Sequence, residues 1–352
     1  MKIGITADAH LTTNKEFPER YKAFANILDQ CIGMGIKNLI VAGDLFNQNS
    51  KNYSEFEIFC NKPEFREIIF HLIPGNHDAD IRQENFGYPN ILVYSEPTWL
   101  DFGKDWDFLF IPYRKNKPMG EIIEKSIEHR NLKKWSLIGH GDWYAGLTSP
   151  NPYEPGVYMP ITSRDISIYK PSQIFLGHIH KPSDFGNLHY PGSPYPLDGS
   201  ETGYRRFLVF DLETNIIDSF RIQTDIIYFT DELIILPTED ELSFIQNNII
   251  KSIEGWELNE ADKEKVQLRV KCRGYSSNKA MLGKIIKEIY HSFHFDIEPD
   301  LSAVSHANDP KRDYLLAFVK DYIDTLEWAE KEYEPGKEEI LLEAMRLIYG
   351  EV

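Results

Sequence analysis

Short apolar runs, rich in β-branched and aromatic residues, recur along the first two thirds of the chain and are followed by polar side chains. A short apolar run bounded by turn residues is typical of a buried strand. Five of these runs are each followed at once by residues that can bind a metal ion. They are residues 2–7, 38–42, 68–73, 136–138 and 173–176.

Segments with helical spacing of apolar residues lie between some of these runs. Residues 17–33 carry such a pattern, and we expect further helices over residues 54–61 and 119–130. Residues 91–94 and 107–112 are predicted to form additional strands. The alternation of strand and helix predicts an α/β fold.

The polar residues that follow the five runs are expected to meet. In open α/β sheets, ligands bind in the crevice beyond the carboxyl ends of the strands, where neighbouring loops converge. A glycine stands near the end of four of the five runs, where it lets the backbone turn sharply and approach a bound group. The candidate residues are Asp8 and His10, Asp44, Asn76 with His77 and Asp78, His140, and His178 with His180.

Seven of these residues form a mixed set of oxygen and nitrogen ligands. One octahedral ion needs about six ligands and usually keeps water, so seven protein ligands imply two ions that share one carboxylate. The absence of a thiolate argues for manganese, iron or zinc in a catalytic role. A lone histidine is more often a core or surface residue, but five of the eleven histidines lie within four residues of the end of an apolar run.

The pattern changes near Asp225. Strands are expected at residues 207–212 and 216–223, and after them strands alternate with helices at residues 239–253 and 278–292, with a strand at 266–272 between them. This second part is predicted to be a small α+β domain. We therefore expect three parts, at residues 1–225, 226–304 and 305–352.

The last part is predicted to be a helical hairpin after a polar linker at residues 305–311. Leu315, Val319, Tyr322, Leu326 and Ala329 are spaced like a coiled-coil seam, and a second helix follows Glu334-Pro335-Gly336. Residues 300–352 carry 13 acidic and 6 basic residues, a balance of −7, which makes DNA an unsuitable partner for this tail. A docking site for the helices of a partner is one interpretation, and packing of the two helices onto their own domain is the other.

Residues 143–160 form a long stretch rich in proline, glycine and tyrosine between two of the ligand clusters. Loops in such positions often carry function, so this one is expected to border the substrate site. An ordered surface loop without a special role is the alternative.

The composition restricts the class of protein and its expected location in the cell. The net charge of −17 argues against a protein that simply coats DNA, but bound cations could supply positive charge locally. Three widely spaced cysteines are expected to be reduced core residues. The strand-like N-terminus leads us to expect no leader sequence, and no apolar run reaches the roughly 18 residues of a membrane span. We expect a soluble, cytoplasmic protein without a membrane partner.

The ordered motifs Asp8-Ala9-His10, Gly43-Asp44, Gly75-Asn76-His77-Asp78, Gly139-His140 and Gly177-His178-Ile179-His180 resemble those of the calcineurin-like metallophosphoesterase superfamily. Within it, the chain is most similar to the DNA double-strand-break nucleases called SbcD in bacteria and MRE-eleven in eukaryotes, including short phage versions. Gly43-Asp44-Leu45-Phe46 and the turn at residues 190–194 support that branch. The resemblance implies a two-sheet α/β/β/α sandwich with a small capping domain and a helical tail.

The resemblance also implies roles for the candidate residues. Asp8, His10 and His180 would hold one ion, Asn76, His140 and His178 the other, and Asp44 would bridge them. His77 would stabilise or protonate the leaving oxygen, with Asp78 as a possible orienting partner. One position departs from the pattern, because relatives often have a histidine three residues after the bridging aspartate and this chain has Asn47.

The resemblance and these roles predict a Mn²⁺-dependent DNA nuclease, an exonuclease with or without endonuclease activity, that works by two-metal catalysis. A phosphatase or cyclic-nucleotide phosphodiesterase on the same scaffold is the alternative, and a non-catalytic protein-binding scaffold is less favoured because no ligand is lost. The sequence has no G-x-x-x-x-G-K-[ST] loop. We therefore expect an ATPase partner of the SbcC or Rad-fifty kind, docked on residues 312–349, and a homodimer through the catalytic domain.

Overall fold

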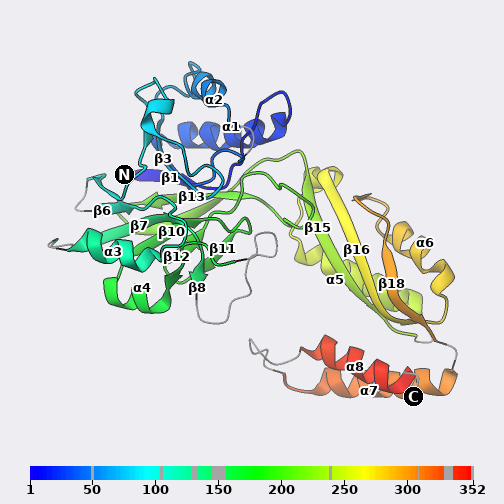
Figure 1. The fold of residues 1–352 in the computed structure, drawn as a ribbon. Helices are drawn as coiled ribbons and strands as arrows, with labels where there is room; N and C mark the ends of the chain where they lie inside the picture. Colours follow the sequence, from blue (N-terminus) through cyan, green and yellow to red (C-terminus); the bar gives the residue numbers. More distant parts are fainter. Residues whose placement is uncertain are drawn as a thin grey trace. The chain divides into compact units, whose positions relative to one another are not determined.

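The computed structural model describes residues 1–48, 51–103, 106–128, 130, 134–144, 156–237, 240–307, 309–328 and 336–349. The chain divides into two compact units, which are coloured from blue to green and from green to red in Figure 1. The first unit comprises Met1–Leu197 and Tyr204–Asp225, and the second comprises Asp198–Gly203 and Ile226–Val352. Each unit has its own sheet structure, so each is described by itself.

Two six-stranded sheets form the first unit. The first sheet is parallel from β1 to β4 and continues on the other side of β1 with two antiparallel strands. In spatial order its strands are β14 (Ile216–Arg221), β13 (Arg206–Asp211), β1 (Lys2–Thr6), β2 (Asn38–Ala42), β3 (Ile69–Ile73) and β4 (Ile91–Val93).

The second sheet has a parallel centre and an antiparallel strand at each edge. In spatial order its strands are β11 (Ser183–Phe185), β12 (Leu188–Tyr190), β10 (Gln173–Gly177), β7 (Lys134–His140), β6 (Trp106–Phe110) and β5 (Thr98–Asp101). A short parallel pair, β8 (Trp143–Tyr144) and β9 (Ile161–Thr162), lies outside both sheets.

Three apolar layers hold this unit together. The inner faces of the two sheets share one core, to which β1 contributes Ile3 and Ile5 and β6 contributes Phe108 and Phe110. Helices α1 (Pro18–Gly33) and α2 (Tyr53–Cys60) share a core with the other face of the first sheet. Helices α3 (Met119–Ile127) and α4 (Ser163–Tyr169) share one with the second sheet. The predicted α/β/β/α sandwich is confirmed.

The second unit is built on a four-stranded parallel sheet. Strand β16 (Val266–Ser276) pairs with β15 (Ile227–Ile235) on one side and with the short β17 (His294–Phe295) and β18 (Asp300–His306) on the other. Helices α5 (Glu241–Gly255) and α6 (Lys279–Ile289) alternate with these strands in sequence. The expected order of strand and helix is observed, and because all pairings are parallel, crossovers rather than hairpins join the strands.

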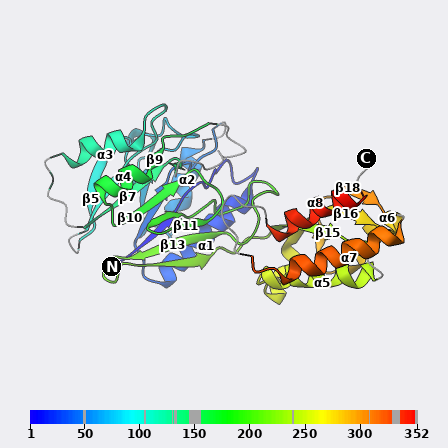
Figure 2. The same ribbon diagram turned by 90° about the horizontal axis from the view of Figure 1, so that it is seen from below.

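Helices α7 (Pro310–Thr325) and α8 (Lys337–Tyr349) run side by side within the second unit, as Figure 2 shows. The buried contacts of the pair are made by Leu316 and Met345, which share a core with Ile234 and Leu236 at the end of β15. At the end of the hairpin, the hydroxyl of Tyr349 donates to Asp313. The hairpin therefore packs onto its own unit.

The predicted coiled-coil seam is wrong in its length, and its residues Leu315 and Tyr322 lie on the exposed face of α7. Leu315 and Tyr322 are 49% and 62% exposed, whereas Leu316 and Ile323 are buried. The helix ends at Thr325 because Leu326 has an extended backbone, with φ −70° and ψ 133°. Ala329 lies outside the described residues. Contact with the core beside β15, which the spacing alone cannot reveal, sets which face of α7 turns inward.

The long stretch expected to form a loop is described only at its ends. Its residues 145–155 lie outside the described part of the chain, and β8 lies at its start. The sequence pattern missed the short elements β5, β11, β12 and α4. None of the helices in the described residues is both long and apolar enough to cross a membrane.

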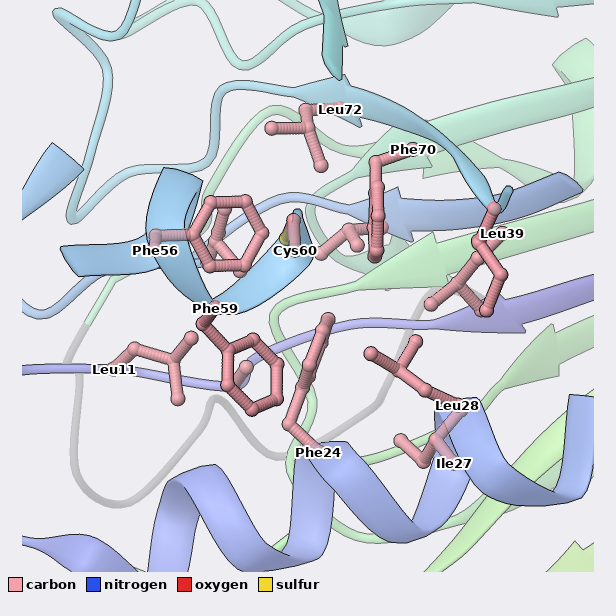
Figure 3. Packing of buried hydrophobic residues seen from close by; sticks show 14 of the residues in the cluster. Leu11, Phe24, Ile27, Leu28, Leu39, Phe56, Phe59, Cys60, Phe70 and Leu72 are labelled. Atoms are coloured by element: carbon pink, nitrogen blue, oxygen red, sulfur yellow. The ribbon is translucent and has the colours of Figure 1, made fainter. Parts of the chain in front are cut away.

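An aromatic layer between α1, α2 and β3 stabilises the first unit (Figure 3). In that layer Phe24 packs against Phe56, Phe59 and Phe70, with ring centroids 6.0–6.5 Å apart. We expect Phe24→Ala to lower the free energy of unfolding by about 3–5 kcal/mol, because it leaves a cavity in this layer. Denaturant titration would measure the loss. Ile32→Ala on the exposed face of α1 should change stability by less than about 0.5 kcal/mol, and equal losses would contradict the role of the layer.

Candidate metal centre

The candidate residues converge because their strands end at one edge of each sheet. Asp8 and His10 follow β1, Asp44 follows β2, and Asn76 with His77 follows β3. His140 ends β7, and His178 with His180 follows β10. Backbone hydrogen bonds join the loops, since the N–H groups of Asp8 and His10 donate to the carbonyls of Gly43 and Asp44, each over 3.0 Å. The cluster of candidate residues thus draws on both sheets.

Four candidate ligands have a left-handed backbone. The φ angles of Asp8, His10, Asp44 and His178 are 53°, 43°, 48° and 95°. Residues other than glycine rarely adopt this conformation, and it costs about 1–3 kcal/mol at each position. The surrounding hydrogen bonds compensate for this strain, and the strain aims side chains that would otherwise follow the strand direction.

Glycines permit the close approach of these loops. A Cβ atom on Gly75 would overlap Oδ1 and the backbone nitrogen of Asp44, and one on Gly43 would overlap the ring of His140. Gly43 also has a φ of 90°, which a glycine adopts at little cost. The glycines therefore bring carboxylate and imidazole groups within reach of one another.

One group of donors consists of Asp8, His10 and His180. Their ligand atoms all lie within 4.8 Å of one another. The Nε2 atoms of the two histidines are 3.2 Å apart. Two imidazole nitrogens that face each other beside a buried carboxylate can bind one cation between them.

A second group of donors surrounds the amide oxygen of Asn76. This Oδ1 atom lies 2.8 Å from Nε2 of His140 and 3.1 Å from Nδ1 of His178. Oδ2 of Asp44 lies 3.3 Å from Nε2 of His140 and 3.7 Å from Nε2 of His10. Asp44 therefore contacts members of both groups, as a shared ligand must.

Five of the seven donors are buried, and their charges depend on each other. Burial raises the pKa of Asp8 to about 6 and lowers the pKa of His10 well below its usual value. Burial alone would lower the pKa of His140, but Asp44 and Asp8 outweigh it and raise this pKa to about 10. For Asp44 burial acts to raise the pKa, and the neighbouring His140 and His10 hold it below its usual value. Buried oxygen and imidazole donors of this kind fit divalent cations.

His77 and Asp78 take different positions beside the cluster. The backbone N–H of His77 donates to Oδ1 of Asp44 over 2.8 Å, and its ring meets the ring of His10 edge-on at 4.7 Å. Donor atoms of His10, Asp44 and His77 also lie within 4.8 Å of one another. The carboxylate of Asp78 is fully buried and accepts the N–H groups of Gly75 and Phe46, over 2.7 and 3.1 Å. Asp78 thus ties the loop after β3 to the loop after β2.

The sequence pattern did not single out two buried arginines that support the cluster. A guanidinium N–H of Arg20 on α1 donates to the carbonyl of His10, and one of Arg205 donates to the carbonyl of His180. Both carbonyls belong to histidines whose side chains are in the first group of donors. The partners are separated by 10 and 25 residues, so no local motif marks these contacts.

A two-sheet α/β sandwich with buried oxygen and nitrogen donors at its strand ends is the architecture of a metal-dependent phosphoesterase. Residues 1–182 match the family model described as calcineurin-like phosphoesterase, which covers more than half of the chain. The chain belongs to this family, and the resemblance in the motifs is confirmed. It is therefore a hydrolase of phosphate esters by family, and the family uses divalent metal ions.

A curated relative is the protein named exonuclease subunit 1 of Enterobacteria phage T4. It is 32% identical over 160 residues, a match that covers 42% of this chain and 43% of the relative. Among solved structures, an archaeal phosphodiesterase aligns with a TM-score of 0.33 and 16% identity, covering 63% of this chain and 100% of that one. A dimetal phosphatase from Danio rerio aligns with a TM-score of 0.40 and 8% identity, covering 63% and 96%.

Gly75→Ala tests the close approach of the two loops. The added Cβ would push the carboxylate of Asp44 away, so we expect the affinity for Mn²⁺ to fall by at least about tenfold. Isothermal titration calorimetry would measure it. Gly33→Ala at the end of α1 is the matched control, because its Cβ meets no atom within 4 Å. Unchanged binding in Gly75→Ala would show that Asp44 does not need this position.

Proposed function

We propose that this chain is the nuclease subunit of a DNA-processing complex and that it hydrolyses phosphodiesters with two Mn²⁺ ions. The observation that carries the proposal is the convergence of seven donors in two groups around Asp44. The relative from phage T4 is named as an exonuclease subunit, which favours DNA over other phosphate esters. The activity of this chain is proposed to lie in the cytoplasm. If a phage encodes the chain, this is the cytoplasm of the host.

The two groups of donors define how the ions would be held. Asp8, His10 and His180 would hold one ion, Asn76, His140 and His178 the other, and Asp44 both. Such a pair of ions, when bound, activates water for attack on phosphorus and neutralises the developing charge. The mixture of carboxylate, amide and imidazole donors without a thiolate suits Mn²⁺.

His77 is proposed to deliver a proton to the leaving oxygen. The bond from its backbone N–H to Asp44 fixes its backbone, and the residue is partly exposed, so a substrate could reach it. Asp78 is proposed to orient this loop through its two backbone hydrogen bonds. Asn47, in the position where relatives often have histidine, is half-buried, and its N–H donates to the carbonyl of Leu11 over 3.0 Å. It can offer an amide to the substrate but no proton at neutral pH.

The hairpin of α7 and α8 is proposed to bind the helices of an ATPase partner of the SbcC kind. Besides the face that packs onto its own unit, α7 has a second apolar face. It consists of Tyr314, Leu315, Phe318 and Tyr322, which are 49–79% exposed. Exposed apolar patches of this kind mark interaction sites. A homodimer through the catalytic unit completes the proposed complex, as the family resemblance implies.

A phosphatase or cyclic-nucleotide phosphodiesterase remains the alternative, since the same two-metal chemistry serves either substrate. The exposed apolar face of α7 favours the subunit of a complex. A non-catalytic scaffold is disfavoured, because every donor of the motifs is present and turned toward the cluster.

Hydrolysis of linear duplex DNA with Mn²⁺, beside bis-nitrophenyl phosphate, tests the function. The wild type should cleave both. His77→Ala should lower the rate by about 10²–10⁴, the usual contribution of a general acid, while Mn²⁺ still binds. The control His291→Ala, at an exposed position of the second unit, should cleave normally.

Two results would overturn parts of this proposal. Cleavage of the small ester without DNA hydrolysis, even with an SbcC-type partner, would favour the phosphatase. Loss of bound Mn²⁺ in His77→Ala would make this residue a ligand.

Phe318→Glu tests the docking face, because a buried charge at an interface is costly. We expect the affinity for the ATPase partner to fall at least tenfold in a pull-down or titration, with unchanged cleavage of bis-nitrophenyl phosphate. The matched control is Ile250→Glu on α5, where the side chain is 49% exposed and lies outside this face. Equal binding by the two variants would remove α7 from the interface.

A further inference from the structure

The ring of His178 has a charged neighbour on the side away from Asn76. Its Nδ1 atom faces the amide oxygen of Asn76, whereas its Nε2 atom lies 3.6 Å from Oδ1 of Asp142. A neutral imidazole that binds a cation through one nitrogen must carry its proton on the other. A carboxylate beside that other nitrogen fixes both the tautomer and the orientation of the ring.

We propose that Asp142 is the positioning residue for His178, keeping the proton of this imidazole on Nε2 so that Nδ1 presents its lone pair to a divalent cation. The inference rests on the proposed two-metal function and assigns a residue outside the seven donors. Asp142 acts through His178 and is not itself a ligand in this proposal.

Backbone and side-chain hydrogen bonds fix the position of Asp142. Its backbone N–H donates to the carbonyl of Tyr158 over 2.8 Å, and its own carbonyl accepts the N–H of Ile161 over 2.9 Å. Its second carboxylate oxygen accepts the N–H of Tyr158 over 2.6 Å. This bond holds one oxygen of the carboxylate, and the other oxygen, Oδ1, faces Nε2 of His178.

A buried tyrosine hydroxyl holds the peptides on either side of Asp142. The hydroxyl of Tyr190 donates to the carbonyl of Gly141 over 3.0 Å and accepts the N–H of Trp143 over 2.7 Å. Tyr190 is 2% exposed, so these two bonds are shielded from water. The ring of Tyr158 lies 4.7 Å from the ring of His178 and covers it. The carboxylate and the ring together limit how the imidazole can rotate.

The neighbouring His140 has its tautomer set in a different way. Its Nδ1 atom lies 2.9 Å from the carbonyl of Ala42, which can only accept a hydrogen bond. The proton is therefore on Nδ1, and Nε2 is left for the cluster. The two histidines of the second group thus turn different ring nitrogens toward Asn76, Nε2 in His140 and Nδ1 in His178. A backbone carbonyl sets the tautomer of His140, whereas a side chain would set that of His178.

Asp142→Asn in the full chain tests the inference. The asparagine keeps the shape of the side chain, and the N–H of Tyr158 should hold its oxygen, which turns the NH₂ group toward Nε2 of His178. A donor there favours the wrong tautomer. We expect calorimetry to show two Mn²⁺ ions on the wild type, and on the variant one ion bound normally and one bound about 10–100-fold more weakly. The electron paramagnetic resonance signal of coupled Mn²⁺ pairs should be replaced at limiting Mn²⁺ by that of single ions.

Asp184→Asn is the matched control. Asp184 also pairs with a histidine, His189, over 2.7 Å, but that histidine lies outside the cluster. Both Mn²⁺ sites should be unchanged in this variant. Tyr190→Phe provides a second test that keeps the buried ring, and it should weaken the same single site less than Asp142→Asn does.

The outcomes separate this inference from the proposed function. Failure of the wild type to bind a pair of Mn²⁺ ions would remove the two-metal function itself. Two normal sites in Asp142→Asn, or equal weakening of both, would overturn the role of Asp142 alone. If Asp142→Asn does not fold by circular dichroism, Tyr190→Phe decides, and two normal sites in that variant would overturn the proposed positioning.

Discussion

The carboxylate of Asp44 is the contact on which the rest of the centre depends. One oxygen accepts a hydrogen bond from the backbone N–H of His77, and the other faces the rings of His140 and His10. Loops from both sheets therefore meet at a single buried charge. Burying an ionised carboxylate costs several kcal/mol unless partners compensate. The fold supplies those partners by ending its parallel strands at a common edge. The left-handed turns and glycines follow from the need to bring them within about 4 Å.

The sequence predicted that these residues would lie together because the information for this is local. Each donor lies within a few residues of a strand end, and a parallel sheet places all such ends together. The apolar runs likewise predicted the parallel strands and the helices that cover them. The proximity of Asp8 and His178 could therefore be predicted from the chain alone, although 170 residues separate them.

What the sequence could not predict depends on partners chosen by the tertiary structure. Arg20 and Arg205 belong to the centre only because the carbonyls of His10 and His180 come to lie beside them. Asp142 follows His140 by two residues, yet its relation to His178 exists only once β7 and β10 are paired. The face of α7 that packs onto its own unit was missed for the same reason. Two apolar faces on one helix give an ambiguous pattern, and the core beside β15 selects Leu316 over Leu315.

Phe46 links the hydrocarbon interior to the polar crevice. Its amide donates to the carboxylate of Asp78, while its ring packs edge-on against Tyr53 and Phe56 at 5.3 and 5.6 Å. Protein interiors are packed as densely as organic crystals and compress little. Because the ring of Phe46 is held by this packing, its backbone amide is held as well. The aromatic layer therefore limits the motion of the loops that carry the donors. Hydrocarbon packing around Phe46 thus helps to fix the positions of the donor atoms in the polar cluster.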